Sequence, residues 1–502
     1  MGLKGFVRHF KPLEILTEGQ LEAIYKGTLE VLWRTGVSFE HEKALKLLTN
    51  SGCKVDYDGM RVRIPPALVE ESIRKCPSNF CVGARDCNND LIMGGDNFYF
   101  GTAPGMQTID LHTWEPRVAT RKENYDGVTI LDALSNVHML SPYTPYFGFQ
   151  GVPPVMAMTE SFAARIRNST KCVCANSNNN SDIFAIEMAK AVGCEILGIG
   201  LISPPLTIAN SAIEAIFRFA EAGFPIRICS GPVMGATAPA TIAGSTIVHN
   251  VEVIAALVLI QIIKPGTRVV IKDFIFPQNM RSGSPVFGAI ETCLHNAIFN
   301  QFFRKYSVPT GNTNSFPSSK IPDYQCGYEK ANLALIAALS GANYTEPYGS
   351  VHGELTFHPV QAILDDDLAG MIGRFLEGVT INAETLALDV INEVIPVPGH
   401  FLGTEHTRKW WKLEHFVPKV ADRLTYSEWH DSGKKSCLDY AKQKMEEILA
   451  THKPIRLTQS QEEDIEKILE EARQYYKKIG LISEEEMAIY TKSMQSPNYP
   501  YE

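Results

Sequence analysis

Apolar positions near the start of the chain recur every three to four residues, which is the spacing of one face of an α-helix. Over residues 13–48 they follow this spacing, and Thr17 and Gln20 precede them at capping-box spacing. The apolar members are Leu21, Ile24, Tyr25, Leu29 and Leu32. A second short helix is predicted after the proline pair at 65–66. We therefore expect residues 1–96 to form a helical N-terminal cap region.

The pattern changes at about residue 97, where short β-rich runs alternate with helical stretches. Each run ends in a cluster of Gly, Pro, Asn or Ser. The eight runs are residues 98–101, 138–142, 171–176, 201–210, 226–230, 268–274, 308–312 and 343–348. Alternating strands and helices predict a parallel sheet, and eight such units over roughly 250 residues match an α/β fold of the (β/α)₈ TIM-barrel type. A doubly wound sheet is the alternative, but no GxGxxG motif follows the first run.

Beyond residue 348 the chain becomes mainly helical again. Residues 458–478 have a charged face and an apolar face. The predicted organisation is therefore a barrel over residues 97–380 and a C-terminal helical region, 381–502, packed on it. The most apolar stretch, 251–263, is too short to span a bilayer and includes a glutamate, so it predicts a buried helix.

Composition and charge narrow the class of protein. The chain has 502 residues, of which 45% are hydrophobic, and a formal net charge of −9. A mildly acidic chain without a basic stripe argues against nucleic acid or an anionic membrane as the main partner. The first fifteen residues lack the continuous apolar segment of a signal peptide, so we expect a cytoplasmic protein. The eleven cysteines include no CxxC pair, which is ordinary usage for a reducing compartment.

The predicted strand ends, where a barrel of this type places its active site, are rich in aromatic side chains. They include Tyr99, Phe100, Tyr143, Tyr146, Phe147, Phe274, Phe316, Tyr344, Tyr348 and Phe357. Several rings around one cavity suit a permanently cationic, alkylated nitrogen, because such a group has no N–H to donate and ring faces are its best partners. The alternative is that these rings only fill the barrel and its mouth.

Motifs of several other enzyme classes do not occur. The sequence has no Walker A motif, GxSxG elbow, HExxH pair or DxDxDG loop. The three aspartates at 365–367 lie in an apolar helical pattern, which favours capping or ion pairing over a divalent ion. No spacing of His, Cys and Asp suggests zinc. We expect no metal site.

A series of short motifs surrounds the seventh predicted strand. They are Tyr-Ser-Val-Pro at 306–309, Asn-Ser-Phe-Pro at 314–317, Lys-Ile-Pro-Asp at 320–323, Gln325, Gly327 and Glu-Lys at 329–330. This series resembles the trimethylamine methyltransferase family, whose best-known members have pyrrolysine where Phe316 stands. Further matches, such as Gly-Ala-Asn at 341–343, keep their order over roughly residues 14–450, so the resemblance covers most of the chain.

The resemblance implies a (β/α)₈ barrel that transfers a methyl group to the cob(I) centre of a separate corrinoid protein, with no cofactor bound tightly by the barrel itself. Phe316 has no electrophilic carbon and cannot form the adduct expected of pyrrolysine. Family members without pyrrolysine include enzymes for quaternary amines, which are already activated. Glycine betaine is the expected substrate, with proline betaine, carnitine and γ-butyrobetaine as alternatives. A betaine-binding or sensing protein that has lost catalysis is the alternative from another class.

Residue by residue, we expect Phe316 to offer a ring face to the cation, together with Tyr99, Phe357 and Tyr348. A betaine carboxylate also needs a hydrogen-bond donor. His352 is the leading candidate, because imidazole can donate to an anion without repelling it. The alternative for His352 is a structural hydrogen bond. Asn312 and Lys272 are lesser donors. Phe316 and His352 are thus the expected catalytic pair. The chain also has the size at which barrels commonly associate into homo-oligomers.

Overall fold

The computed structural model describes residues 5–312, 315–394 and 396–501, so Asn314 lies outside the described residues. Within these ranges, eight parallel strands form a closed barrel, because the last strand pairs with the first. In order around the barrel they are β7 (Asn97–Thr102), β10 (Met139–Leu140), β11 (Cys172–Ala175), β12 (Ile196–Ile202), β14 (Ile226–Ser230), β16 (Val269–Asp273), β18 (Thr310–Asn312) and β19 (Tyr344–Tyr348). The predicted barrel is confirmed.

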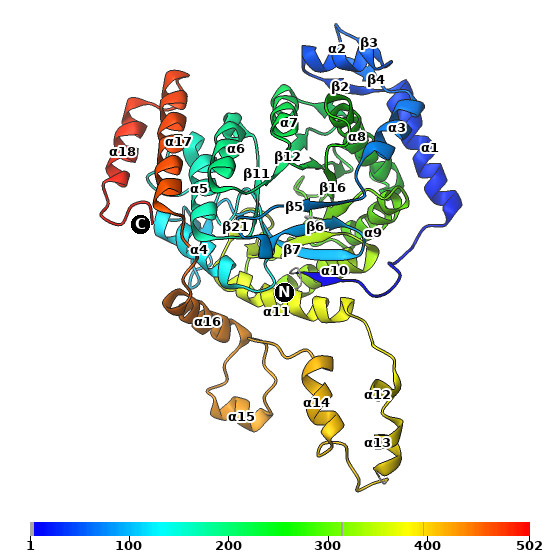
Figure 1. Cartoon of the computed structure of the whole chain (residues 1–502), viewed down its shortest axis with the longest axis vertical. Coiled ribbons are helices and arrows are strands. Elements are labelled where there is room, and N and C mark those ends of the chain that lie inside the picture. Colours follow the sequence, from blue (N-terminus) through cyan, green and yellow to red (C-terminus); the bar gives the residue numbers. More distant parts are fainter. Residues whose placement is uncertain (1–4, 313–314, 395, 502) are drawn as a thin grey trace.

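A helix follows each barrel strand and covers its outer face (Figure 1). These helices are α4 (Arg121–Ala133), α5 (Ala157–Asn168), α6 (Ser181–Val192), α7 (Asn210–Ala222), α8 (Ile242–Ile263), α9 (Ile290–Lys305), α10 (Tyr324–Ser340) and α11 (Pro359–Leu376). Apolar side chains on alternate strand positions pack against them, since successive residues of a strand point to opposite faces. The other positions point into the barrel.

The fourth barrel strand, β12, begins and ends earlier in the sequence than the predicted run at 201–210. Pairing with β11 begins at Ile196 and pairing with β14 at Gly198, and β12 ends at Ile202. The proline pair at 204–205 falls in the loop that follows. Pro has no N–H for a sheet ladder, so it ends the strand. The β-rich pattern that continued to residue 210 instead includes β13 (Thr207–Ile208), which pairs outside the barrel.

The N-terminal region combines helices with short strands. Its helices are α1 (Glu18–Arg34), α2 (Glu42–Asn50) and α3 (Pro66–Lys75), and its strands are β1 (Phe6–Val7), β2 (Val37–Phe39), β3 (Lys54–Asp56), β4 (Arg61–Arg63), β5 (Asn79–Val82) and β6 (Leu91–Gly94). The capping box of Thr17 and Gln20 is confirmed. The helical pattern predicted over residues 13–48 is interrupted, however, at Gly36, whose φ of +74° ends the first helix and turns the chain into β2.

The apolar stretch near residue 251 forms part of α8, a buried helix of 22 residues that begins at Ile242. It is the one helix among the described residues that is long and apolar enough to cross a membrane, but 78% of its most apolar window is buried inside the protein. The predicted burial is confirmed, whereas the predicted length was too short. Helices α1, α2 and α3 of the N-terminal region pack on α8.

The C-terminal region contains α12 (Ala383–Leu386), α13 (Leu388–Glu393), α14 (Glu405–Glu414), α15 (Tyr426–Asp431), α16 (Cys437–Thr451), α17 (Gln459–Lys478) and α18 (Glu484–Met494). Helix α16 packs on α11 and α4, and α17 packs on α6 and α5. The apolar side predicted for residues 458–478 is buried there. Helices α12 to α15 stand away from the barrel (Figure 1).

Candidate active site

The N-terminal end of the barrel interior is apolar. Tyr99, Tyr344 and Val270 lie in one buried cluster with side chains of the β5–β6 hairpin, which closes this end. The Tyr99 hydroxyl accepts a hydrogen bond from the backbone N–H of Ile92 at 3.0 Å. Tyr99 therefore belongs to the closed end of the barrel, and the structure does not bring it together with Phe316.

A charged layer lies above this apolar layer. Arg227 Nη1 is 2.6 Å from Glu346 Oε1, and Lys272 Nζ is 2.9 Å from Glu346 Oε2. The Ser141 hydroxyl donates to Glu346 Oε1 at 2.5 Å. Although burial opposes it, the Lys272 and Arg227 cations lower the pKa of Glu346 below its ordinary value. The Glu346 carboxylate is therefore ionised, and the two cations beside it leave this layer with a net positive charge.

Phe316 lies in a cluster of four phenylalanines at the C-terminal ends of β16 and β18. Its ring centroid is 6.3 Å from that of Phe274, 6.5 Å from that of Phe276 and 6.2 Å from that of Phe287. Phe316 is fully buried, whereas Phe274 and Phe287 are half-buried. Phe274 directly follows Lys272 and Asp273, and the Lys272 ammonium lies 5.7 Å from its ring centroid. The cluster is thus adjacent to the charged layer.

A short hairpin of β20 (Ser350–Val351) and β21 (Thr356–Phe357) places its tip over this cluster. Gly353 at the tip has a φ of +66°, and a Cβ there would lie 2.4 Å from Cε2 of Phe287. Only glycine fits this approach. The structure therefore brings the segment that carries His352 and Glu354 together with the cluster that contains Phe316.

The pKa values of the two ionisable residues beside Gly353, His352 and Glu354, are shifted by their surroundings. Burial lowers the pKa of His352, and the neighbouring Lys320 lowers it further. Its backbone N–H donates to the Ser319 carbonyl at 2.7 Å. Burial raises the pKa of Glu354, an effect that Lys272 partly offsets. The imidazole of His352 is therefore neutral at pH 7 and can serve as a hydrogen-bond donor through one N–H.

Polar side chains form another part of the barrel mouth. Asn176 donates to the Tyr143 hydroxyl, and Asn178 accepts from it at 3.4 Å. Beside them is a cavity of about 420 Å³ with a largely polar lining, which includes the asparagine run at 178–180 that follows the third strand. The sequence had placed these asparagines at the end of that strand. This part of the mouth offers amide and hydroxyl groups.

Three further predicted residues face elsewhere. The Tyr348 hydroxyl donates to Asp366 of α11 at 3.0 Å, outside the barrel wall. Asn312 accepts from Asn300 of α9 at 3.0 Å, also outside it. Phe357, at the base of the hairpin, packs edge-on against Tyr146 at 5.8 Å. These contacts are structural; Tyr348 and Phe357 belong to a different core cluster from Phe316, and neither a hydrogen bond nor a ring pair joins these three described residues to it.

Residues of metal-ligand type meet at one place among the described residues. His249, Asp273 and His295 are fully buried, with potential ligand atoms within 4.8 Å of one another. They lie between β16, α8 and α9, outside the barrel wall. His295 Nδ1 is 2.9 Å from Asp273 Oδ2, which is a hydrogen-bond distance, and the two imidazole rings are stacked at 5.5 Å. The arrangement ties α8 and α9 to the end of β16.

Arg227, Glu346, Phe276 and Phe287 were missed as candidate site residues. Arg227 and Glu346 could have been found from the sequence. Each is a charged residue within a run of strand-forming residues, and the alternation of side chains along a strand directs it into the barrel. Phe276 lies in the short strand β17 (Phe276–Pro277), and Phe287 lies in the loop that follows it before α9. The sequence gives no periodicity there, so their approach to Phe316 could not be inferred.

A family model described as Trimethylamine methyltransferase (MTTB) matches residues 1–475 of the chain. The chain belongs to the trimethylamine methyltransferase (MttB) family. It is 30% identical over 456 residues to a glycine betaine methyltransferase from Desulfitobacterium hafniense (strain Y51), covering 88% of this chain and 93% of the relative. It is 29% identical over 476 residues to the trimethylamine methyltransferase MttB of D. hafniense (strain DSM 10664 / DCB-2), covering 92% and 94%.

The MttB-family fold also matches a solved structure, the crystal structure of the hydroxylamine MtmB complex. The TM-score is 0.50 at 15% sequence identity, with 93% of this chain and 89% of that chain covered. At this identity the likeness supports the fold alone. The family expected from the motifs at 306–330 is confirmed, and the protein is a methyltransferase of the MttB family.

Proposed function

We propose that this MttB-family methyltransferase removes a methyl group from a quaternary amine, most simply glycine betaine, and delivers it to the cob(I) corrinoid of a partner protein. The observation that carries the proposal is the position of Lys272. Its ammonium lies between the ionised Glu346 carboxylate and the ring of Phe274, the half-buried edge of the phenylalanine cluster. A cationic donor and an aromatic surface are thus neighbours at the barrel mouth.

The aromatic surface suits the trimethylammonium end of the substrate. The rings of Phe274 and Phe287 are half-buried, and Phe316 and Phe276 support them from behind. A quaternary ammonium on such rings gains on the order of 1–2 kcal/mol for each well-placed face, most where water is excluded. Phe316 therefore acts as the support of the aromatic surface, and the half-buried rings make the contact.

The positive charge of the interior layer suits the carboxylate end. The Lys272 ammonium and the Phe274 ring centroid are 5.7 Å apart, so one small zwitterion such as glycine betaine can reach both groups at once. Lys272 can donate to a carboxylate while Glu346 stays paired with Arg227. His352 is a second donor, because its loop lies on Phe287. A carboxylate bound to Lys272 would thus set the trimethylammonium against the rings.

The reaction needs no proton transfer to the leaving group. The carbon–nitrogen bond breaks with its electron pair kept by nitrogen, so the product is a neutral tertiary amine. The electron pair of the new carbon–cobalt bond comes from cob(I). The protein's task is to hold one methyl in line and to exclude water. We propose that the corrinoid protein docks at the strand-end face, that the barrel binds no cofactor tightly, and that the enzyme acts in the cytoplasm.

The test is methylation of a cob(I) corrinoid by the purified enzyme, followed through the cobalt absorbance, with glycine betaine, proline betaine, carnitine, γ-butyrobetaine and trimethylamine compared. Methylation by glycine betaine is expected, with no reaction of trimethylamine. Methylation by trimethylamine at a similar rate would refute the role of the aromatic surface. A preference for a longer betaine would keep the class and correct the substrate.

A non-catalytic betaine sensor is the second candidate, because Phe316 removes the chemistry expected of pyrrolysine while the aromatic surface remains. It is separated from the enzyme by the same experiment. A sensor would bind betaine by calorimetry and leave cob(I) unmethylated with every amine in the panel.

A further inference from the structure

A segment of the C-terminal region, residues 377–415, extends from the end of α11 and returns to it; we call this segment the arm. It contains α12, α13 and α14, and it stands away from the barrel (Figure 1). None of the residues in these three helices, all of which the structure describes, is buried. Contacts within the arm, such as the ion pair between Glu384 of α12 and Lys409 of α14, join its outgoing and returning segments. The arm therefore has helices without a core.

The exposed surface of the arm is strongly apolar. Ten large apolar side chains of its described residues are at least 40% exposed: Val379, Ile381, Leu386, Leu388, Ile391, Val397, Phe401, Leu402, Trp411 and Leu413. Leu402 is 82% exposed and Val397 96%. With roughly 150 Å² or more for a large side chain, this is on the order of 1,000 Å² of apolar surface. The largest apolar patch on a typical monomer is only about 300–600 Å².

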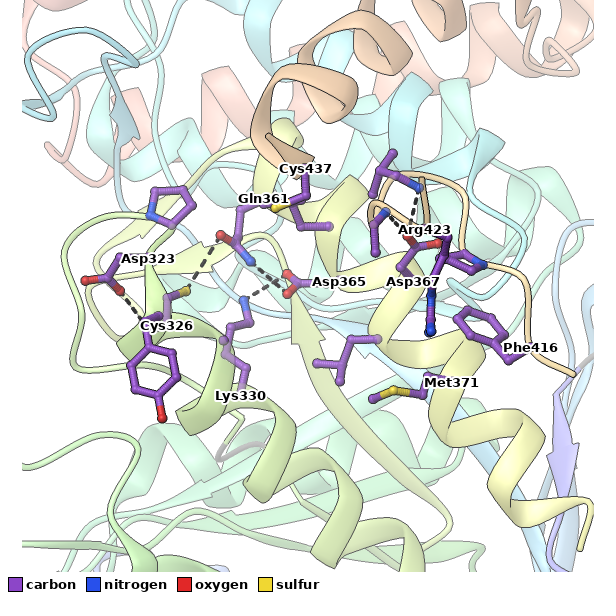
Figure 2. Close-up of a pocket in the computed structure, with 18 residues that line it drawn as sticks. Asp323, Cys326, Lys330, Gln361, Asp365, Asp367, Met371, Phe416, Arg423 and Cys437 are labelled. Carbon is purple, nitrogen blue, oxygen red and sulfur yellow. Dashed lines mark hydrogen bonds and ion pairs between the residues drawn. The ribbon is translucent and has the colours of Figure 1, made fainter. Parts of the chain in front are cut away.

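A second apolar surface lies beside the root of the arm, along the exposed face of α11. One cavity of about 570 Å³ lies between α10, α11 and the chain at 416–423, and a second of about 680 Å³ continues toward Leu13 and Val379. Met371 and Phe416 line both, so the two form one groove, which we call the α11 groove. Figure 2 shows both side chains at the edge of the first cavity.

The buried charged groups in the floor of the α11 groove, Lys330, Asp365 and Asp367, already have hydrogen-bond or ion-pair partners. Lys330 lies 2.8 Å from Asp365, which also accepts from Gln361 at 2.9 Å. Asp367 accepts from the backbone N–H groups of Val420 and Ala421. These interactions are dashed in Figure 2. A polar small molecule would have to break them, whereas an apolar protein surface would leave them intact.

We propose that the arm is a dimerisation element, and that in a twofold dimer the arm of each copy covers the α11 groove of the other. Both apolar surfaces are on one chain and do not cover each other, which is what a self-complementary interface requires. Two arms and two grooves would bury more than about 2,000 Å², the range of obligate homodimers, whose interfaces are also the most apolar. A second copy is therefore the occupant that fits both the area and the composition. This proposal does not depend on the proposed substrate.

The first experiment measures the mass of the full-length chain in solution by size-exclusion chromatography with light scattering. Leu402→Glu tests the arm, and Met371→Glu tests the groove, where Met371 is 47% exposed. Ile489→Glu is the matched control, because Ile489 is 55% exposed on α18, at the other end of the molecule. The wild type and the control are expected at twice the chain mass of 55.7 kDa. Each test variant should weaken the dimer by roughly tenfold or more.

The second experiment is hydrogen exchange of the same four proteins, which reports on the arm even if a variant is less stable. In the wild type and the control, the amides of α13 and α14 should be protected, and in the test variants they should exchange faster without change in the barrel strands. A monomeric wild type would overturn the proposal. So would a dimer that both test variants leave unchanged, or a larger ring that Leu402→Glu does not dissociate.

Discussion

The ammonium of Lys272 lies 2.9 Å from the Glu346 carboxylate, at the level where the barrel interior changes from apolar to charged. Lys272→Met removes one cation from this layer and leaves the pair of Arg227 with Glu346 in place. Glycine betaine should bind roughly tenfold to a hundredfold more weakly, because a hydrogen bond to a charged group is worth about 1.5–3 kcal/mol. Tetramethylammonium, which has no carboxylate, should bind with nearly unchanged affinity. Calorimetry with both ligands measures this, and equal losses would exclude Lys272 as the carboxylate donor.

His352 provides a similar comparison at the hairpin tip. If its neutral imidazole donates to the substrate carboxylate, His352→Ala weakens glycine betaine binding by roughly 0.5–1.5 kcal/mol and spares tetramethylammonium. His352→Gln keeps a donor and should recover part of the loss. The same calorimetric pair of ligands decides between the two roles. Unchanged binding of both would leave His352 a structural residue of the loop.

Phe316 supports the aromatic surface without contacting solvent. Phe316→Ala should lower the free energy of unfolding by about 3–5 kcal/mol, the cost of truncating a buried phenylalanine. Phe316→Leu should retain most of that stability and lower the methyl-transfer rate only in part, because it keeps apolar volume behind the contacting rings and removes the supporting ring. Phe299→Leu is the control, since Phe299 is equally buried in α9, stacked on His249. Full activity of Phe316→Leu in the cob(I) assay would exclude a role for the ring.

Gly353 lies directly on Phe287, and this contact fixes the hairpin tip. Gly353→Ala introduces a Cβ 2.4 Å from the ring at a φ of +66°, so it should displace the loop and raise the KM for betaine. Gly378→Ala is a close control, because Gly378 has the same φ but its nearest neighbour would be at 3.6 Å. Combining Gly353→Ala with Phe287→Leu should recover part of the stability and leave the backbone strain of about 1 kcal/mol. Identical effects of the two alanine variants on KM would argue against the contact.

Glu252 of α8 is buried, and it accepts hydrogen bonds from the Ser230 hydroxyl and from the backbone N–H of Leu206. Burial raises its pKa from an ordinary 4.5 to about 7. Between these two pH values the folded protein binds the Glu252 proton more tightly than the unfolded chain does. The contribution of this proton to the free energy of unfolding is therefore complete below pH 4.5 and is lost as the pH rises to 7. The loss is about 3 kcal/mol.

Glu252→Gln removes this dependence and keeps hydrogen-bonding groups at both positions. Urea unfolding from pH 4.5 to pH 8 should show that the variant gains stability relative to the wild type as the pH rises. The exposed Glu463→Gln is the control and should run parallel to the wild type. A constant difference between Glu252→Gln and the wild type over this range would contradict the raised pKa.

The barrel could be predicted because each strand and each helix leaves a local signal, the change in period from two to near four. The site could be predicted only in part, because side-chain direction depends on register. Tyr99 lies early in β7, so it faces the closed end. Asn312 points outward because its neighbour Gly311 occupies the inward position, where a Cβ would collide with the Tyr344 ring.

Tyr348 shows a third reason. Alternation from Tyr344 and Glu346, both inward, would direct Tyr348 inward as well. A shift in the β19 pairing register between Thr345 and Tyr348 reverses that direction and turns its hydroxyl toward Asp366. Bulges of this kind depend on the neighbouring strand and have no sequence period. Phe316 was identified through its family motif, and its partners on the loop before α9 needed the three-dimensional structure.

The apolar character of α8 on all its sides has a consequence for co-translational folding. During synthesis this helix emerges with the length and composition of a membrane anchor, and about two hundred and forty residues precede it. The helices α1, α2 and α3 pack on α8 and precede it in the sequence, so they leave the ribosome before it. The N-terminal helices can therefore cover α8 as soon as it is synthesised. In a product that lacks them, α8 would be exposed to the secretion machinery and to chaperones as a long apolar helix.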